Sequence, residues 1–191
     1  MLPVYVMIGG GSSRFGQDKA TYPVDGEPWA MHVGRRLAAS LDQITLVGGA
    51  SVPHELASLR WIADQPPQVG PLAGLMGAIV DRQQRLGPGL LVLASCDLVQ
   101  PSRDDLAPLL ATFADTQQLH VAAYRAADRW QPFPAVLHTL CQQRLATLIA
   151  EGVTSLQAVF TALESQAVPW PGDANGPPQA NTLLELQRWR Q

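Results

Sequence analysis

Short apolar runs alternate with amphipathic helical stretches along this chain, and this alternation limits the choice of fold more than any other feature. Residues 4–8, 44–47 and 90–94 are largely apolar runs, as expected for strands that are buried on both faces. Between the last two runs, the apolar residues of 72–80 recur at i, i+3, i+4, i+7 and i+8, a spacing that indicates a helix. The pattern predicts an open parallel sheet that is covered by helices on both faces.

Shorter patterns of the same kinds predict the remaining elements. The expected strands and extended segments are 22–26, 60–63, 119–124 and 133–137, the last of which is weakened by a proline. The expected helices are 29–41, 53–59, 101–113, 139–149 and 155–163. The Pro- and Gly-rich stretch 169–178 is expected to be a loop. Thr182 and Glu185 have the spacing of a capping box that opens a last helix.

Composition narrows the class of protein. The 191 residues fit one domain, 1–191, and an apolar fraction of 47% excludes a disordered chain. A net charge of −3 argues against a nucleic-acid partner, because binding a phosphate backbone requires a concentrated basic face. Cys96 and Cys141 lie far apart, so neither a disulfide framework nor a zinc site is expected. No apolar run reaches the ~20 residues of a membrane span and no signal peptide is evident, so we expect a cytoplasmic protein with no membrane partner.

The loop after the first predicted strand has the composition of a phosphate-binding turn. Gly9, Gly10 and Gly11 let the backbone approach a ligand closely, and successive N–H groups of such a turn can bind an anion. Arg14 and Lys19 add positive charge. The spacing matches neither the Walker loop nor the dinucleotide-binding fingerprint. An ordinary glycine-rich turn between a strand and a helix therefore remains the alternative.

Three further loops follow predicted strands or precede predicted helices, at the edge where open α/β sheets bind their ligands. Asp97 lies just beyond the most apolar strand, and is either a Mg²⁺ ligand beside substrate phosphates or a helix-cap or turn residue. Asp64 follows another strand and precedes Gly70 and Pro71, which are also ordinary residues for the start of a helix. Asn181 precedes the last helix and is the residue there that capping does not explain.

Taken together, these loops resemble those of a known family. Residues 7–19 follow its opening motif L-A-G-G-x-x-x-R-M-G-x-D-K, 64–74 follow D-x-x-P-x-x-G-P-L-A-G, and 95–97 follow P-C-D. Weaker matches to P-L-x-A-L at 132–136 and to the terminal N-T-P-E-E-L at 181–186 extend the resemblance over essentially the whole chain. The chain is identified as a member of the molybdenum cofactor guanylyltransferase (MobA) family of nucleotidyltransferases.

The resemblance implies a Rossmann-like, three-layer α/β fold with a mostly parallel sheet and helices on both faces. It also implies a Mg²⁺-dependent enzyme that transfers GMP from GTP to molybdopterin cofactor and releases pyrophosphate. The nucleotide is expected in the N-terminal part of the domain, 1–115, and the acceptor in the C-terminal part, 116–191. Other implied partners are cofactor-biosynthesis proteins or molybdoenzyme chaperones, in transient contact.

The family's functional residues are transferred to this chain position by position. The expected catalytic residues are Arg14, Lys19 and Asp97, with Asp97 as the Mg²⁺ ligand. The expected nucleotide-binding residues are Met7, Ile8, Gly9, Gly10, Lys19, Asp64, Gly70, Pro71, Leu72 and Asp97. Asn181 is expected to bind the acceptor.

Departures from the family pattern leave alternatives open. Gly48 and Gly49 stand where the family often has an asparagine that touches the nucleotide, and Leu183 replaces the usual proline. The alternatives are a related nucleotidyltransferase with another nucleotide or acceptor, of the cytidylyltransferase or sugar-phosphate type, and a non-catalytic paralogue that binds a nucleotide or a pterin.

Overall fold

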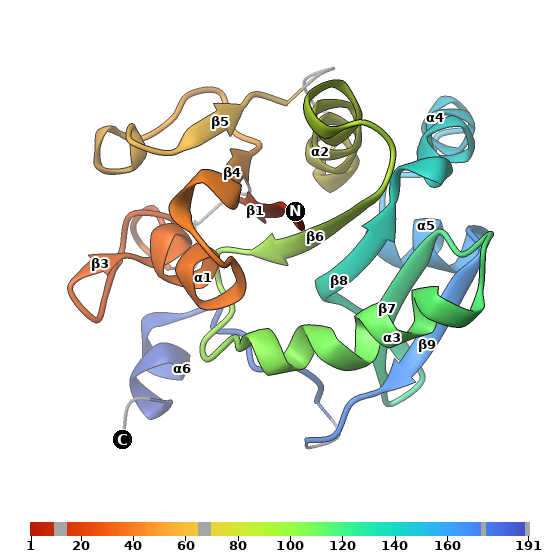
Figure 1. Ribbon diagram of the computed structural model, residues 1–191. Coiled ribbons are helices and arrows are strands. Elements are labelled where there is room, and N and C mark those ends of the chain that lie inside the picture. Colours follow the sequence, from red (N-terminus) through yellow and green to blue (C-terminus); the bar gives the residue numbers. More distant parts are fainter. Residues whose placement is uncertain (10–14, 65–69, 173–174, 190–191) are drawn as a thin grey trace.

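The computed structural model describes residues 1–9, 15–64, 70–172 and 175–189, which form a seven-stranded sheet with helices on both faces (Figure 1). The strands of this sheet are β1 (Val4–Met7), β4 (Ile44–Val47), β5 (Arg60–Ile62), β6 (Leu90–Ser95), β7 (Val121–Ala126), β8 (Arg129–His138) and β9 (Ser165–Pro169). A separate hairpin contains β2 (Pro23–Val24) and β3 (Glu27–Pro28). The α-helices are α1 (Trp29–Leu37), α2 (Pro71–Leu86), α3 (Ala107–Asp115), α4 (Gln142–Ala150), α5 (Leu156–Ala162) and α6 (Leu183–Arg188). Among the described residues, none of the helices combines the length and the apolar character needed to cross a bilayer.

The sheet has the strand order β5-β4-β1-β6-β8-β7-β9. β1 pairs in parallel with both β4 and β6, whereas β8 runs antiparallel to its neighbours β6 and β7. The chain passes from β1 outward to β4 and β5 and then returns to β6 on the other side of β1. The topological switch point therefore lies between β1 and β6, where ligands of open α/β sheets bind beyond the carboxyl ends of the strands.

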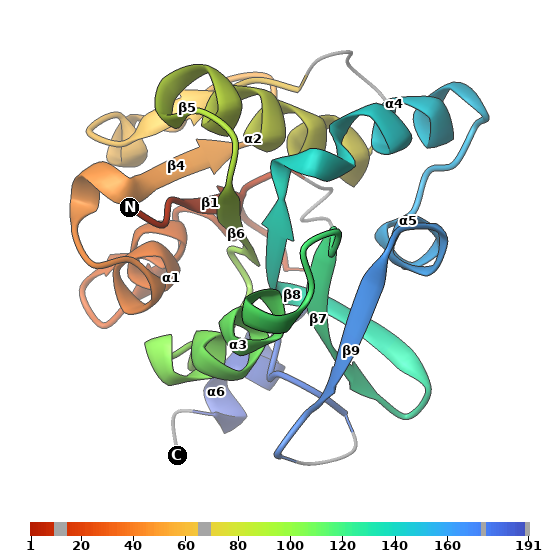
Figure 2. The ribbon, with the colours of Figure 1, turned by 45° about the vertical axis from the view of Figure 1, so that its right-hand side comes forward.

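Two apolar cores lie on opposite faces of the sheet, which confirms the predicted three-layer α/β fold. Val4 and Val6 of β1 belong to one core, and Tyr5 and Met7 to the other, as the two-residue period of a strand buried on both faces requires. The first core includes residues of α1, α3 and α6, and the second includes residues of α2, α4 and α5. The two sets of helices lie on either side of the sheet in Figures 1 and 2.

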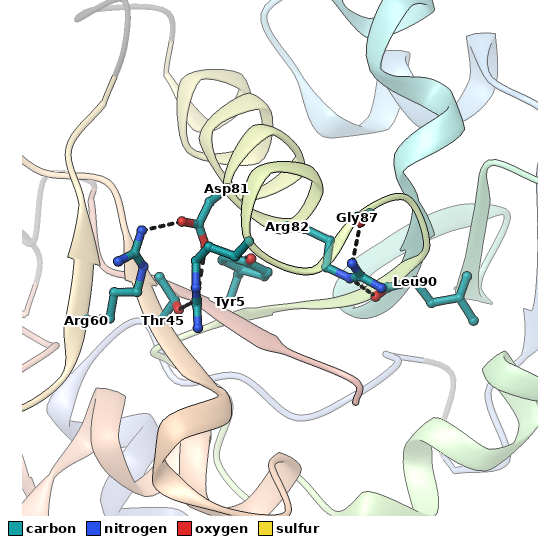
Figure 3. Close-up of polar contacts among 8 residues, drawn as sticks. Tyr5, Thr45, Arg60, Asp81, Arg82, Gly87 and Leu90 are labelled. Carbon is teal, nitrogen blue, oxygen red and sulfur yellow. Dashed lines mark hydrogen bonds and ion pairs between the residues drawn. The ribbon is translucent and has the colours of Figure 1, made fainter.

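An ion-pair network centred on the buried Asp81 fastens α2 to the sheet (Figure 3). Asp81 of α2 is 5% exposed and accepts a hydrogen bond from the Tyr5 hydroxyl at 2.8 Å. The same carboxylate pairs with Arg60 and, at 3.2 Å, with Arg85. Burial raises the pKa of Tyr5, and its hydrogen bond to Asp81 adds to the shift. The network holds α2 against β1 and β5, with Gly74 in its first turns beside the end of β1.

The C-terminal half differs from the expected pattern in two strands. β8 has 10 residues rather than the predicted 133–137, although it contains Pro132 and Pro134. The prolines are tolerated because they fall at an irregularity: β7 pairs with residues 129–131 and 135–137, and β6 pairs only with residues 135–138. β9 was not predicted at all, and it pairs in parallel with β7 at the edge of the sheet.

Several predicted helices are shorter than expected. α1 ends at Leu37 rather than at 41, and the segment 53–59 contains only the 3₁₀ turn His54–Leu56. The helix predicted at 101–113 begins as a 3₁₀ turn, Arg103–Leu106, because Ser102 forms a capping box there, and it continues as α3. The predicted capping box at the start of α6 is confirmed.

Candidate active site

Two clusters of residues lie beyond the carboxyl ends of β1, β4, β5 and β6. The lysine cluster consists of Lys19, Asp97 and Asn181. The glycine cluster consists of Gly9, Gly48, Gly49, Asp64 and Gly74. Both clusters join segments that are far apart in the sequence, and both contain residues that the sequence analysis singled out.

Lys19 is the centre of the lysine cluster. Its Nζ donates a hydrogen bond to Asn181 Oδ1 at 2.9 Å and lies 3.4 Å from Asp97 Oδ2. The side chains of Lys19 and Asp97 are each 15% exposed, so water screens this pair only partly. The ring of Phe15 is buried beneath the ammonium group, with its centroid 5.9 Å from Nζ. An ammonium group that is fixed in this way at the switch point is suited to binding phosphate oxygens.

The segment that precedes α6 brings Asn181 to the cluster. Ala180 N donates to the Asp97 carbonyl oxygen at 3.0 Å, so the two segments run side by side. The Asn181 N–H donates to the Glu185 carboxylate, which belongs to the α6 capping box. The backbone on both sides of Asn181 is thus fixed, and its amide oxygen is directed at Lys19.

Asp97 has the one feature in this site that points to a cation. Its Oδ1 atom is buried and has no hydrogen-bond partner among the described residues. A buried, unpartnered polar atom is costly, and a carboxylate oxygen is the ligand that Mg²⁺ prefers, together with oxygens of substrate phosphates. In the part of the chain that the structure describes, no three His, Cys, Asp or Glu side chains form a metal-binding group. The unpartnered Oδ1 of Asp97 therefore fits a Mg²⁺ that substrate phosphates also hold.

Asp64 lies in the glycine cluster against closely spaced main-chain atoms. Its Oδ2 accepts a hydrogen bond from Gly49 N at 3.1 Å. A Cβ at Gly9 would lie 2.9 Å from Gly49 N, and a Cβ at Gly48 would lie 3.2 Å from Gly9 N. A Cβ at Gly74 would lie 3.7 Å from the other carboxylate oxygen of Asp64. Side chains at Gly9 and Gly48 would crowd these main-chain atoms, so main chain and carboxylate together line this part of the site.

The other predicted nucleotide-binding residues lie at the ends of β1 and α2. Met7 is the last residue of β1, and Ile8 N donates to the Val47 carbonyl oxygen at 2.9 Å. Pro71 and Leu72 begin α2, and the Leu72 side chain is buried in the core, so only its main chain can reach a ligand. Two further predicted residues lie outside the described part of the chain: Gly10 and Arg14.

Cys96 and His138 have surroundings of a structural kind. Burial raises the pKa of the Cys96 thiol, and the charge of Asp97 raises it further, which disfavours the nucleophilic thiolate form. His138 Nδ1 accepts a hydrogen bond from Leu140 N at 3.0 Å.

Two tryptophans adjoin the site, and sequence reasoning did not connect either of them with it. Trp29 Nε1 donates to the Leu98 carbonyl oxygen, and Trp61 Nε1 donates to the Gly48 carbonyl oxygen, both at 2.8 Å. The sequence indicates only that the N–H of a buried indole needs a hydrogen-bond acceptor. That acceptor is non-local in both cases, so the sequence does not identify it.

The fold is shared with solved nucleotidyltransferases. Molybdopterin-guanine dinucleotide biosynthesis protein A from Archaeoglobus fulgidus has a TM-score of 0.68 at 18% identity, over 98% of this chain and 96% of that chain. The 2-C-methyl-D-erythritol 4-phosphate cytidylyltransferase from Thermus thermophilus has a TM-score of 0.64 at 13% identity, over 98% and 96%. One of these names refers to a guanine nucleotide and the other to a cytidine nucleotide. Likeness of fold therefore does not show which nucleotide this chain uses.

Sequence comparison is more specific than likeness of fold. The family model of the MobA-like NTP transferase domain matches residues 4–167. A molybdenum cofactor guanylyltransferase from Burkholderia orbicola (strain MC0-3) is 34% identical in an alignment 168 residues long, which covers 81% of this chain and 79% of that protein. The chain belongs to the MobA-like NTP transferase family, and the resemblance found in its motifs is confirmed.

Proposed function

We propose that this protein transfers GMP from GTP to the phosphate of a molybdopterin cofactor and releases pyrophosphate. The observation behind the proposal is the lysine cluster, in which a buried and unpartnered carboxylate oxygen lies beside an ammonium group at the switch point. The name of the relative at 34% identity supports the choice of GTP and of the cofactor. The reaction would take place in the cytoplasm, with transient contacts to cofactor-biosynthesis proteins or molybdoenzyme chaperones.

The chemistry of this reaction requires positive charge at the lysine cluster. An oxygen of the acceptor phosphate attacks the α-phosphorus of GTP, and the bond from that phosphorus to the departing pyrophosphate breaks. Both reactants are anionic, so catalysis depends on orienting them and neutralising their charge. Lys19 binds phosphate oxygens, assisted by Arg14 and the backbone of the glycine-rich turn. Asp97 would hold Mg²⁺, which supplies further neutralising charge when it is bound.

The glycine cluster is suited to the base of the nucleotide. Asp64 Oδ2 is already bonded to Gly49 N, whereas Oδ1 faces the space that the glycines leave open. Guanine presents adjacent N–H donors to such an acceptor. The main chains of Met7, Ile8 and Gly10, and of Gly70, Pro71 and Leu72, complete the nucleotide site.

The acceptor lies on the other side of the lysine cluster. Asn181 comes from the C-terminal part of the chain and contacts Lys19 directly, and this contact supports assigning it to the acceptor phosphate. The N-terminal part, 1–115, would thus bind GTP, and the C-terminal part, 116–191, would bind the pterin.

Pyrophosphate release with purified protein and molybdopterin cofactor tests the proposal. GTP, CTP, ATP and UTP are compared, each with and without Mg²⁺, and Asp97→Asn is the inactive control. We expect release with GTP and Mg²⁺ only. Release with CTP, or with a sugar phosphate as the acceptor, would identify a related nucleotidyltransferase instead. Nucleotide binding without release with any of these acceptors would identify a non-catalytic paralogue.

A further inference from the structure

Two tryptophan side chains each donate a hydrogen bond to a peptide group next to one of the two clusters. Trp29, the first residue of α1, is 0% exposed and donates its indole N–H to the Leu98 carbonyl oxygen at 2.8 Å. Trp61 of β5 donates its indole N–H to the Gly48 carbonyl oxygen, also at 2.8 Å. Neither side chain belongs to the clusters themselves, but each fixes a peptide group next to one of them.

Trp29 supports the lysine cluster in two ways. Its hydrogen bond fixes the carbonyl group of Leu98, the residue that directly follows Asp97. Its indole ring also packs against the ring of Phe15, with the centroids 5.8 Å apart. The same Phe15 ring also lies against Lys19, whose Nζ is 5.9 Å from the ring centroid. A single buried side chain thus supports both the carboxylate and the ammonium group of the cluster.

Trp61 supports the glycine cluster through one peptide group. The carbonyl oxygen of that group belongs to Gly48 and accepts from Trp61, while its N–H belongs to Gly49 and donates to Asp64 Oδ2 at 3.1 Å. Gly48 and Gly49 have φ values of +100° and +75°, and glycine enters this region without steric cost. The peptide between them can therefore rotate readily, and the two hydrogen bonds determine its orientation. Loss of the bond to Trp61 would free the group that holds the Asp64 carboxylate.

We propose that Trp29 and Trp61 are positioning residues that control the two halves of the site separately. Trp29 orients Asp97, and thereby determines the affinity for the divalent cation and the phosphates. Trp61 orients Asp64, and thereby determines the selectivity for the base. The assignment of these ligands rests on the proposed function, whereas the separation of the two effects rests on the two hydrogen bonds.

The experiment compares Trp29→Phe with Trp61→Phe, so that each variant is the matched control of the other. Each variant loses one hydrogen bond, from an indole N–H to a main-chain carbonyl oxygen, and the two bonds have the same length. Calorimetry measures the Kd of GTP and of CTP, and then the Kd of Mg²⁺ in the presence of a GTP analogue that cannot react. These binding constants do not require turnover.

The proposal predicts that each variant changes a different binding property. Trp29→Phe weakens Mg²⁺ binding about tenfold, the size of one lost hydrogen bond, and leaves the ratio of the GTP and CTP affinities unchanged. Trp61→Phe lowers that ratio about tenfold and leaves Mg²⁺ binding unchanged. Trp130→Phe is a further control, because it loses an indole hydrogen bond to the Thr161 hydroxyl of α5 at 3.2 Å, outside both clusters. It should change neither the Kd of Mg²⁺ nor the ratio of the GTP and CTP affinities.

Stability of the buried variant needs its own control. Trp29→Phe leaves space in the core, so its melting temperature is measured by circular dichroism. If this variant does not fold, benzothienylalanine at position 29 keeps the shape of the ring and lacks only the N–H. The same tenfold loss of Mg²⁺ affinity is expected with this residue, since only the hydrogen bond is removed.

The outcomes separate this inference from the proposed function. If the wild-type protein binds no nucleotide, both are wrong. If it binds GTP and releases pyrophosphate, but the two variants change the same constant or neither constant, only the inference about the tryptophans is overturned.

Discussion

Replacement of Asp97 by alanine should stabilise the fold while it abolishes nucleotidyl transfer. Asp97 Oδ1 is buried without a donor among the described residues, and an unpartnered buried polar group costs about 1–3 kcal/mol. Its Oδ2 lies 3.4 Å from Lys19 Nζ, and a partly exposed pair of this kind contributes about 0–1 kcal/mol. Lys19 keeps its hydrogen bond to Asn181 in the variant. The difference is a gain of about 1 kcal/mol in the free energy of unfolding, or about 2–4 °C in Tm for a chain of this size.

Asp81→Ala is the matched control, because it makes the same chemical change at a buried carboxylate with a full set of partners. Asp81 binds the Tyr5 hydroxyl and pairs with Arg60 and Arg85. Its removal leaves the buried Tyr5 hydroxyl without an acceptor, which should cost about 1–3 kcal/mol. The two arginines add little, because their side chains are 50% and 32% exposed and water can solvate them. The two aspartates thus have opposite predicted effects on stability.

Urea unfolding followed by circular dichroism measures both changes, and pyrophosphate release measures activity. The reasoning is refuted if Asp97→Ala loses about 1 kcal/mol or more. Asp97 would then be a residue that stabilises the fold, and the physical basis for its assignment to Mg²⁺ would be lost.

Three further changes test other parts of the structure. Tyr5→Phe should cost only about 1 kcal/mol in urea unfolding, because Asp81 keeps both arginine partners; a loss as large as that of Asp81→Ala would contradict this. Lys19→Gln should lower kcat for pyrophosphate release about 100-fold, since a charged donor to the reacting phosphates is lost, and unchanged kcat would exclude this role. Burial lowers the pKa of His138 below 6.5, and nearby positive charge lowers it further. The neutral ring therefore contributes stability above pH 6.5, and this stability is lost as the pH falls through the folded-state pKa. His138→Asn can still accept from Leu140 N, so its unfolding free energy should decline less below pH 6.5 than that of the wild type, and equal slopes would argue against the prediction.

The sequence was sufficient to predict the carboxyl edge of the sheet because the relevant residues follow strands. β1, β4 and β6 are runs of residues buried on both faces, and their pattern is visible without a structure. Parallel strands present their carboxyl ends at one edge, so Asp64 and Asp97 had to lie near the glycine-rich turn. The structure brings both of them there, together with Lys19.

The remainder of the fold depends on contacts between distant segments. β9 is an edge strand with mostly half-buried or exposed side chains, so its sequence shows no strong periodicity, and its pairing with β7 is what makes it a strand. The contact between Asn181 and Lys19 depends on the hydrogen bond of Ala180 to Asp97, which joins residues far apart in the chain. The acceptors of the two indole N–H groups were hidden for the same reason.

The most direct test of the proposed activity follows the α-phosphate of GTP. Protein, molybdopterin cofactor and Mg²⁺ are incubated with GTP that is labelled in either its α- or its γ-phosphate, and the products are separated. The proposed reaction places the α-label in a pterin dinucleotide and the γ-label in pyrophosphate, and neither transfer occurs with Asp97→Ala. A cofactor product that contains the γ-label, or an α-label that stays in GTP under all conditions, would contradict guanylyl transfer by this protein.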